Sequence, residues 1–302
     1  MRIASCSVEG TPCLGVLTEH GFVDLGRRMD GVRDLADLVA PDRLAEAARV
    51  ARGARPDHAV EELRWEPTVP VSGRIFCIGV NYGGRRDEYP DDTPETSYPS
   101  VFVRFVSSLV GHEQALVRPA ESVQLDYEGE IVAIIGRGGR RIAEPDAKHH
   151  LAGLSVGNDG TVRDWVRHGR FNVTQGKNWD ASGSAGPWLT TLDEVGDLDD
   201  LQVSTRVNGE LRQQDTTASM AFPIAYQVAY LSTFCTLVPG DAIFTGTPTG
   251  AGARLDPPRF LAPGDTVEVT VSRVGTLRNG VRDEGEEDHG VPVAVGDEAV
   301  SR

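Results

Sequence analysis

Short strand-like runs, separated by glycine and proline, constrain the fold of this chain more than any other feature. The chain has 34 glycines and 18 prolines among 302 residues, about one residue in six. Such a density suits strands and turns better than a helical bundle, because both residues interrupt helices. The clearest strand-like runs are residues 74–80, 100–105, 130–136, 201–209, 240–246 and 265–275. The sequence therefore predicts a strand-rich α+β fold.

Helical spacing of apolar residues is found in two regions. Residues 32–54 predict two short helices, broken at Pro41. Residues 219–237 predict one longer helix, with Pro223 near its start because proline fits the first turn better than the interior of a helix.

The distribution of these elements predicts a division of the chain. Residues 1–30 read as a small antiparallel meander, and Pro67 and Pro70 lie in a linker-like stretch before the first central strand. The C-terminal residues are polar and acidic, which is typical of a loose end. We expect a small N-terminal domain over residues 1–65, a main domain over 72–280 and a loose acidic tail over 281–302.

Composition excludes several classes of partner. The chain carries 45 acidic and 30 basic residues, a formal net charge of −15. Nucleic acids and anionic membranes attract clustered positive charge, so we expect neither as a partner. The sequence has neither an apolar run of bilayer length nor a secretory signal, and its four cysteines are scattered. We therefore expect a cytoplasmic protein without a disulfide framework or a cysteine zinc site.

The acidic residues at the start of one predicted strand are the strongest local indication of a functional site. Glu128 and Glu130 flank Gly129 and run into the apolar stretch 131–135. Side chains alternate along a strand, so both glutamates should point to one side. A buried pair of carboxylates is costly unless a cation compensates it, and Mg²⁺ or Mn²⁺ prefers such oxygen ligands. A solvated acidic strand end is the alternative.

Other polar residues follow strand-like runs. Asp159 lies in a glycine-flanked segment that is also a common turn sequence, so its position alone does not identify a site. Lys177 is one of only two lysines, with Lys148, in a chain that otherwise uses arginine. The segments 81–82 and 245–250 are strand-end loops with small or polar residues, where sites tend to lie.

Taken together, these segments resemble the fumarylacetoacetate hydrolase family over residues 72–278, about two-thirds of the chain. The matching blocks are GRIFCIGVNY, PSVFVRFVSSLVG, DYEGEIVAIIG, GNDGTVRDW, GKNWDASGSAGPW, RVNGELRQ, LVPGDAIFTGTPTG and FLAPGDTVEV. The resemblance implies a mixed β-roll or sandwich core, a small leading domain, a catalytic domain over 72–280 and a homodimer.

The resemblance also implies an active site and a reaction. The family binds Mg²⁺ or Mn²⁺ and cleaves C–C bonds of 2-oxo or β-dicarbonyl acids, by hydrolysis or decarboxylation, through a metal-stabilised enolate. The implied metal ligands are Glu128, Glu130 and Asp159. The implied substrate-binding residues are Tyr82, Arg163 and Thr247. The implied catalytic residues are Lys177, Glu88 and Arg85.

One implied position departs from the family pattern. In hydrolytic members a His–Glu pair on a mobile loop activates water, and here the loop 82–99 carries Arg85 in place of the histidine and Glu88 as the glutamate. Arginine cannot accept a proton at working pH. Glu88 could act alone while Arg85 binds a substrate carboxylate. Alternatively, the enzyme could catalyse decarboxylation or keto–enol isomerisation without activated water, or it could be catalytically silent. Arg104 and Val166 replace a usual lysine and glutamine.

Overall fold

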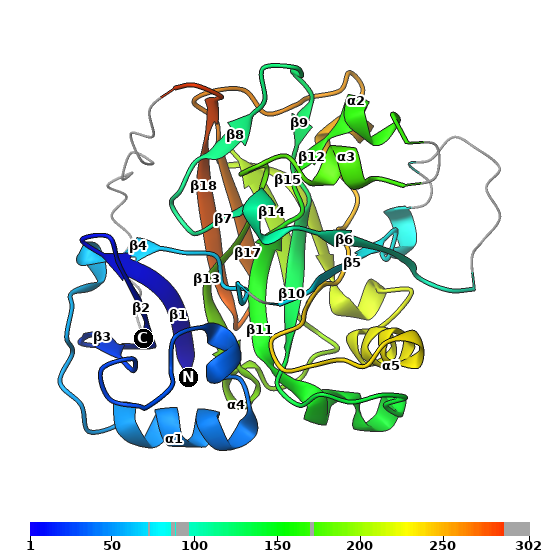
Figure 1. Cartoon of the computed structure of the whole chain (residues 1–302). Helices are drawn as coiled ribbons and strands as arrows, with labels where there is room; N and C mark the ends of the chain where they lie inside the picture. Colours follow the sequence, from blue (N-terminus) through cyan, green and yellow to red (C-terminus); the bar gives the residue numbers. More distant parts are fainter. Residues whose placement is uncertain (72, 86–87, 89–96, 170–171, 287–302) are drawn as a thin grey trace.

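The structure is a computed structural model that describes residues 1–302 except 72, 86–87, 89–96, 170–171 and 287–302. Two sheets pack against each other at its centre, and the N-terminal segment lies at one side of the larger sheet (Figure 1). The strand-rich α+β fold predicted from the sequence is confirmed. In the described part of the chain, none of the helices has the length and apolar character needed to cross a bilayer.

The larger sheet joins the N-terminal strands to the central strands. Its spatial order is β3 (Gly21–Asp24), β2 (Thr11–Thr18), β1 (Arg2–Val8), β13 (Gly183–Thr191), β11 (Leu151–Asn158), β10 (Gly129–Ile135), β16 (Ala242–Phe244), β5 (Ile75–Gly79) and β6 (Ser100–Arg104). In addition, β4 (Arg64–Trp65) pairs with β1, and β7 (Leu109–Val110) pairs with β13. The meander predicted over residues 1–30 is therefore present as β1 to β3, and β1 joins it to the central strands.

The second sheet covers one face of the larger sheet. Its order is β15 (Glu210–Thr216), β14 (Gln202–Val207), β17 (Thr266–Val271), β18 (Gly275–Asp283) and β8 (Leu116–Arg118). Beside it, β9 (Leu125–Asp126) pairs with β12 (Thr161–Val162). The run 265–275, predicted as one strand, is instead divided between β17 and β18, because Arg273 takes a left-handed conformation, φ 63°, in the turn between them.

Burial on both faces makes β10 the centre of the fold. Ile131 and Ala133 contribute to the core between the two sheets, which also contains Val269 of β17. The alternate residue Val132 points to the opposite face, in the core that contains Leu35 of the N-terminal segment. Every residue of β10 is buried, which explains why its sequence is apolar without a polar alternation.

Helices are short and lie at the ends and edges of the sheets. The α-helices are α1 (Pro41–Ala51), α2 (Arg163–Val166), α3 (Thr174–Lys177), α4 (Leu192–Val195) and α5 (Ile224–Phe234). The 3₁₀ helices are η1 (Leu35–Asp37), η2 (Val60–Glu62), η3 (Gly83–Arg85), η4 (Val106–Ser108), η5 (Glu144–His150), η6 (Thr217–Ser219) and η7 (Gly252–Arg254). The two helices predicted over residues 32–54 are η1 and α1, and the predicted break at Pro41 is confirmed, with Pro41 as the first residue of α1.

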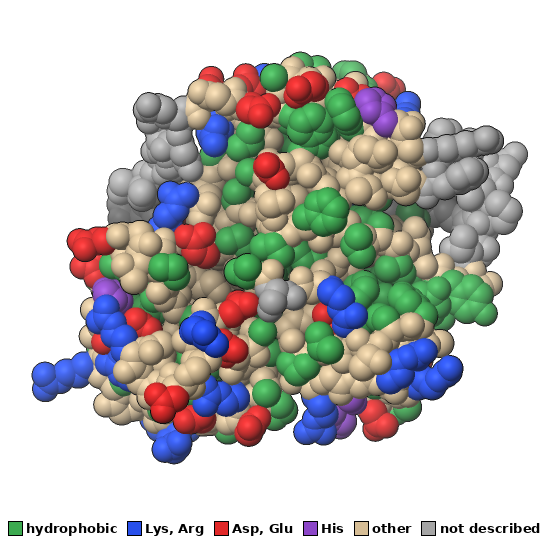
Figure 2. All heavy atoms as spheres, in the orientation of Figure 1, with side chains coloured by type: hydrophobic (Ala, Val, Ile, Leu, Met, Phe, Trp, Pro, Cys, Tyr) green, Lys and Arg blue, Asp and Glu red, His purple; other side chains and the backbone are tan. Residues whose placement is uncertain are grey.

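Helix α5 is shorter than the predicted helix over 219–237, because Pro223 occupies its N-cap. A continuous row of aromatic rings runs along one side of this helix: Phe222, Tyr226 and Tyr230 are stacked, and Phe234 meets Tyr230 edge-on. Figure 2 shows hydrophobic side chains gathered over β6 and α5 on the right of the molecule. This row of rings ends at Phe234, which is exposed.

The predicted domain boundary between residues 65 and 72 stays a prediction. The pairing of β1 with β13 places strands from both sides of this boundary in one sheet. The tail predicted from residue 281 begins within β18, which continues to Asp283. The remainder of that tail, residues 287–302, lies outside the described residues.

A half-buried histidine links β18 to the loop before β8. The Nδ1 atom of His112 accepts a hydrogen bond from the backbone N–H of Arg278 at 3.0 Å, and its ring packs edge-on against Trp65. Burial, and then the charge of Arg278, lowers the pKa of His112 from 6.5 to about 4. The carboxylate of Glu113 lies 3.8 Å from Nε2. His112 is therefore neutral in the folded protein at neutral pH.

This histidine predicts a loss of stability in mild acid. Between pH 6.5 and about 4 the unfolded chain binds a proton at His112 and the folded chain does not, so the free energy of unfolding falls as pH falls through this window. The full contribution, on the order of 3 kcal/mol, is present above pH 6.5. We expect His112→Asn to lose less stability than the wild type between pH 7 and 4.5 in urea unfolding. The exposed His20→Asn is the control, and equal losses in all three proteins would contradict the prediction.

Candidate active site

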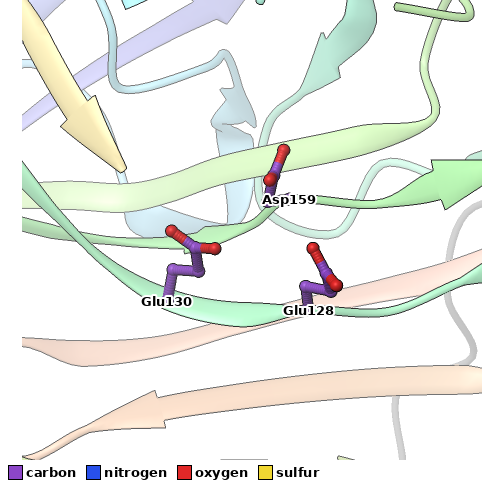
Figure 3. Close-up of side chains that lie close together, drawn as sticks. All are labelled: Glu128, Glu130 and Asp159. Carbon is purple, nitrogen blue, oxygen red and sulfur yellow. The ribbon is translucent and has the colours of Figure 1, made fainter. Parts of the chain in front are cut away.

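Two antiparallel strands bring three carboxylates together at one end of the larger sheet (Figure 3). Glu128 precedes β10, Glu130 is its second residue, and Asp159 follows β11. Because Gly129 of β10 lies opposite Asn158 of β11, the ends of the two strands coincide. One oxygen from each carboxylate lies within 4.8 Å of the others. All three side chains are buried, so the alternative of a solvated acidic strand end does not describe them.

Gly129 allows the second sheet to approach this end of β10. A Cβ atom at this position would lie 2.0 Å from Oγ1 of Thr205 and 2.9 Å from Cγ1 of Val269. Gly129 therefore faces the core between the sheets, and the alternation along the strand turns Glu130 to the other face. The glycine between the two glutamates is required for packing on the side away from the carboxylates.

Two cations pair with Glu128 from different elements. The Nζ atom of Lys177, at the end of α3, lies 2.5 Å from Oε2 of Glu128 and 2.5 Å from Oδ2 of Asp159. Arg163, at the start of α2, donates to Oε1 of Glu128 at 2.6 Å and to Oδ2 of Asp126 at 2.7 Å. Both oxygens of Glu128 are thus held by charged donors, which fixes the orientation of its carboxylate.

A third cation, Arg104, holds Asp159. Its Nη1 atom donates to Oδ1 of Asp159 at 2.7 Å and to the carbonyl of Gly160 at 2.8 Å. Its other nitrogens donate to the hydroxyls of Ser108 and Ser182, each at 3.1 Å. Arg104 donates from all three nitrogens of its planar guanidinium group, whereas a lysine has a single nitrogen to donate from. The sequence identified Arg104 only as a departure from the family lysine, and this contact explains what the arginine does.

Glu130 is the carboxylate of the triad that forms no salt bridge with a described residue. Its Oε2 atom accepts the backbone N–H of Gly246 at 2.8 Å. Burial, followed by the negative charges of Asp159 and Glu128, raises the pKa of Glu130 well above its ordinary value. The ionised form of this carboxylate is therefore destabilised, and a further cation beside it would stabilise that form.

The charge balance of the site fits a hard divalent cation. In the described residues, four buried carboxylates face three cationic side chains, namely Asp126, Glu128, Glu130 and Asp159 against Lys177, Arg163 and Arg104. The uncompensated charge lies at the triad, whose ligand atoms are all oxygens. Mg²⁺ and Mn²⁺ prefer this donor set.

Lys177 keeps its proton in this environment. Burial alone would lower the pKa of Lys177, but the charges of Asp159 and Glu128 outweigh it and raise the pKa above its ordinary value. The side chain is nearly fully buried, and its ammonium group contacts two members of the triad. Lys177 therefore places a positive charge beside Glu128 and Asp159.

Thr247 is held in place by a residue that sequence reasoning missed. Its hydroxyl donates to the carbonyl of Gly129 at 2.9 Å and accepts from Nε2 of Gln213 at 2.9 Å. The Oε1 atom of Gln213 in turn accepts the backbone N–H of Gly129 at 3.0 Å. Gln213 thus joins the second sheet to the start of β10 and to the loop 245–250. A glutamine on a strand carries no sequence signal for this role.

Tyr82 lies on the loop that follows β5. It is buried, and its hydroxyl has no hydrogen-bond partner among the described residues. Burial, together with the charges of Glu130 and Asp215, raises the pKa of Tyr82. The preceding Asn81 donates to the carbonyl of Thr245 at 2.7 Å, which ties this loop to the strand-end loop 245–250. The raised pKa keeps the phenol of Tyr82 neutral at neutral pH.

The predicted lid is described only in part. Glu88 is half-buried, and its Oε1 atom accepts the backbone N–H of Gly250 at 2.8 Å. Arg85 ends η3, and its side chain lies outside the described residues, as does most of the predicted lid. The structure thus brings Glu88 to the loop that carries Thr247.

Comparison with known proteins identifies the family. Residues 74–282 match the family model described as fumarylacetoacetate (FAA) hydrolase C-terminal. The chain is 38% identical over 226 residues to the oxaloacetate tautomerase YisK of Bacillus subtilis, with 74% of each chain covered. The chain belongs to the fumarylacetoacetate hydrolase family. The resemblance inferred from the sequence is thereby confirmed.

Relatives within the family are enzymes with different reactions. The human mitochondrial oxaloacetate tautomerase FAHD2B is 35% identical over 240 residues, covering 79% of this chain and 76% of its own. Fumarylacetoacetate hydrolase from Exiguobacterium antarcticum superposes with a TM-score of 0.77 at 30% identity, covering 94% and 99%. Maleylpyruvate hydrolase from Sphingobium sp. SYK-6, solved with manganese(II) and pyruvate, has a TM-score of 0.77 at 27% identity, covering 94% and 99%. The predicted fold of the family is therefore confirmed.

Proposed function

We propose that this protein is a Mg²⁺- or Mn²⁺-dependent enzyme that interconverts the keto and enol forms of a 2-oxo dicarboxylic acid such as oxaloacetate. The observation that carries the proposal is the buried triad of Glu128, Glu130 and Asp159, in which Glu130 has no cationic partner among the described residues. Support for the reaction comes from the oxaloacetate tautomerases that are 35–38% identical to this chain.

Glu128, Glu130 and Asp159 would hold the ion. When bound, the ion supplies a Lewis acid that polarises the 2-oxo group and stabilises negative charge on its oxygen. Lys177 and Arg104 hold the carboxylates of Asp159 and Glu128 in their orientations before any substrate arrives. Such preorganisation means that little rearrangement is needed when charge develops on the substrate.

The lid favours tautomerisation over hydrolysis. Hydrolysis of a C–C bond needs a base that activates water, and the position implied for the histidine of that pair is Arg85. Tautomerisation moves one proton from C3 of the substrate to the oxygen on C2 and consumes no water. The carboxylate of Glu88 would accept the C3 proton. The hydroxyl of Tyr82, which has no hydrogen-bond partner among the described residues, would donate to a substrate oxygen.

Two residues implied as substrate-binding are proposed to act differently. Arg163 makes its described hydrogen bonds to Asp126 and Glu128, so we assign it the positioning of Glu128. The hydroxyl of Thr247 is bonded to Gly129 and Gln213, so it shapes the wall of the site. The homodimer and the cytoplasmic location expected from the sequence stay predictions.

A second candidate is the hydrolysis of an acylpyruvate with Glu88 as the only base. It is favoured by the hydrogen bond that joins Glu88 to Gly250 of the loop 245–250, and by the hydrolases that share this fold. The two candidates share the metal site and Lys177. They differ in whether water enters the product, which makes the product the deciding measurement.

Metal binding should stabilise the folded protein through Glu130. At about 100 times its dissociation constant, Mn²⁺ should add about 2.7 kcal/mol to the free energy of unfolding. We expect Glu130→Gln to remove most of this gain, because the amide cannot replace the carboxylate as a charged ligand. Thermal unfolding with Mn²⁺ and with EDTA measures both.

The metal-free protein provides an internal check. Glu130→Gln removes a buried charge that is repelled by Asp159 and Glu128, so it should not destabilise the protein in EDTA. The exposed Glu121→Gln should keep the whole metal effect. A full Mn²⁺ gain in Glu130→Gln would refute the assignment of this ligand.

The two lysines provide a matched test of turnover. We expect Lys177→Met to lower the Mn²⁺-dependent decay of the oxaloacetate enol at least about 100-fold, because the charge that orients two triad carboxylates is lost. Lys148→Met, which changes an exposed side chain, should leave the rate unchanged. Enol absorbance, followed with and without EDTA, measures the rate. A wild-type protein that binds Mn²⁺ yet leaves the enol decay at its uncatalysed rate would contradict tautomerisation.

Restoring the histidine tests why hydrolysis is disfavoured. We expect Arg85→His to raise the hydrolysis of a short acylpyruvate at least about tenfold, because an imidazole beside Glu88 can take a proton from water. Release of pyruvate measures the reaction, and Arg49→His on the exposed face of α1 is the control. An unchanged rate would show that position 85 does not limit hydrolysis in this protein.

A further inference from the structure

Two cysteines lie opposite each other in the N-terminal hairpin, far along the chain from the triad. Cys6 of β1 pairs directly with Cys13 of β2, so their side chains project from the same face of the sheet. Their Sγ atoms are 3.0 Å apart, and both cysteines are free thiols. In the sequence the four cysteines look scattered, and the pairing register of β1 with β2 is what brings these two together.

The geometry fits a disulfide better than a metal site. A disulfide places its sulfurs about 2.05 Å apart, so the two Sγ atoms need to approach by about 1 Å. Residues directly opposite in an antiparallel pair have the Cα separation that a disulfide requires. Among the described residues, the acidic triad is the only group of three or more His, Cys, Asp or Glu side chains that could hold a metal ion. The cysteine pair therefore lacks a third ligand of this kind.

Access to the pair differs between the two sulfurs. Cys6 is buried, whereas Cys13 is partly exposed and lines a cavity of about 510 Å³. Arg27, Arg33 and His58 also line this cavity, together with Asp24. A small reagent can thus reach Cys13 from solvent, while Cys6 stays covered behind it.

The electrostatics of the pair support different roles for the two thiols. The hydrogen bond between them lowers the pKa of Cys13 and raises the pKa of Cys6, and burial raises the pKa of Cys6 further. Burial and the charge of Asp24 oppose the lowering of the pKa of Cys13, and Arg27 adds to it, with a lowered pKa as the net result. The accessible sulfur is therefore the better nucleophile, since a thiolate is the reactive form of cysteine.

We propose that Cys6 and Cys13 form a reversible intramolecular disulfide when the protein meets a peroxide. The Cys13 thiolate attacks one peroxide oxygen, the O–O bond breaks, and hydroxide leaves a sulfenic acid on Cys13. The Cys6 sulfur then attacks Cys13, an S–S bond forms, and the S–O bond breaks. The hydroxyl of the sulfenic acid leaves with the Cys6 proton as water. The hydroxide released in the first step takes up the proton that Cys13 lost when it became a thiolate. The two sulfurs lose two electrons and hydrogen peroxide gains them.

The exposure of Cys13 would also allow the disulfide to be reduced again. A disulfide with one accessible sulfur can be attacked by a reducing thiol, and exposed disulfides belong to the labile class. The bond would join β1 to β2 at one point, and β1 also pairs with β13 of the central sheet. The pair is independent of the metal site, so failure of this proposal leaves the proposed function untouched.

The test uses hydrogen peroxide on the purified full chain. After oxidation, the protein is unfolded and alkylated, and we expect the number of alkylated cysteines to fall from four to two. Cleavage after Glu9, which lies between the two cysteines, should yield two peptides that stay joined until a reductant is added. Detection of this joined pair by mass spectrometry, and its release by dithiothreitol, would support the proposal.

Variants separate the disulfide from other oxidation. Cys6→Ser removes the resolving thiol, so we expect Cys13 to proceed to irreversible sulfinic acid and dithiothreitol to recover at most a tenth of the thiol recovered in the wild type. Cys235→Ser should leave the joined peptides unchanged. The proposal is overturned if wild-type Cys13 becomes sulfinic acid without joining Cys6, if Cys13 joins a cysteine of another molecule, or if four cysteines remain alkylated after peroxide.

Discussion

Carboxylates that are held a few ångströms apart inside a protein repel one another, and the shared end of β10 and β11 concentrates three of them. The surrounding structure is arranged around this repulsion. Lys177, Arg163 and Arg104 reach the site from three different elements, and each bonds to a member of the triad. Breaking a buried ion pair of this kind by removing one partner typically costs about 3–5 kcal/mol. The charges that surround the triad therefore also determine how loops and short helices dock on the sheet.

The second sheet takes part in the site through packing and hydrogen bonds. Its strand β17 approaches β10 closely because Gly129 has no side chain there, and Gln213 of β15 reaches across to bond Gly129 and Thr247. The wall of the site is thus set by packing between two sheets. A substitution in the second sheet can change the geometry of the site even though the residue is distant from the triad in the sequence.

Local pattern predicted the strand-rich character of the chain and part of the site, whereas the architecture was implied by the resemblance to a family. Alternation along a strand was enough to place Glu128 and Glu130 on one side. Pro41 correctly marked the break between two helices, and Pro223 correctly marked a helix start. Asp159 could not be distinguished from an ordinary turn residue, because its proximity to the glutamates depends on the register of β10 with β11.

Tertiary contacts explain what the sequence did not predict. Arg104 and Gln213 act through partners that are more than thirty residues away, and no local period records such contacts. The prediction of a single strand over residues 265–275 was wrong. The chain turns at Arg273 and pairs back on itself as a hairpin, and the residues on both sides of the turn have the composition of a strand. The resemblance to a family supplied the ligand set, which the residues alone left open.

The scarcity of lysine has a practical consequence for labelling chemistry. Of the two lysines, Lys177 is buried with its ammonium group bonded to carboxylates, and Lys148 is exposed in η5. Reagents that acylate amines react with the accessible, unprotonated form, so Lys148 is the lysine side chain they reach in the folded protein. A fluorophore or a surface tether can therefore be attached at one defined lysine on the outside of the molecule, leaving the lysine in the interior unmodified.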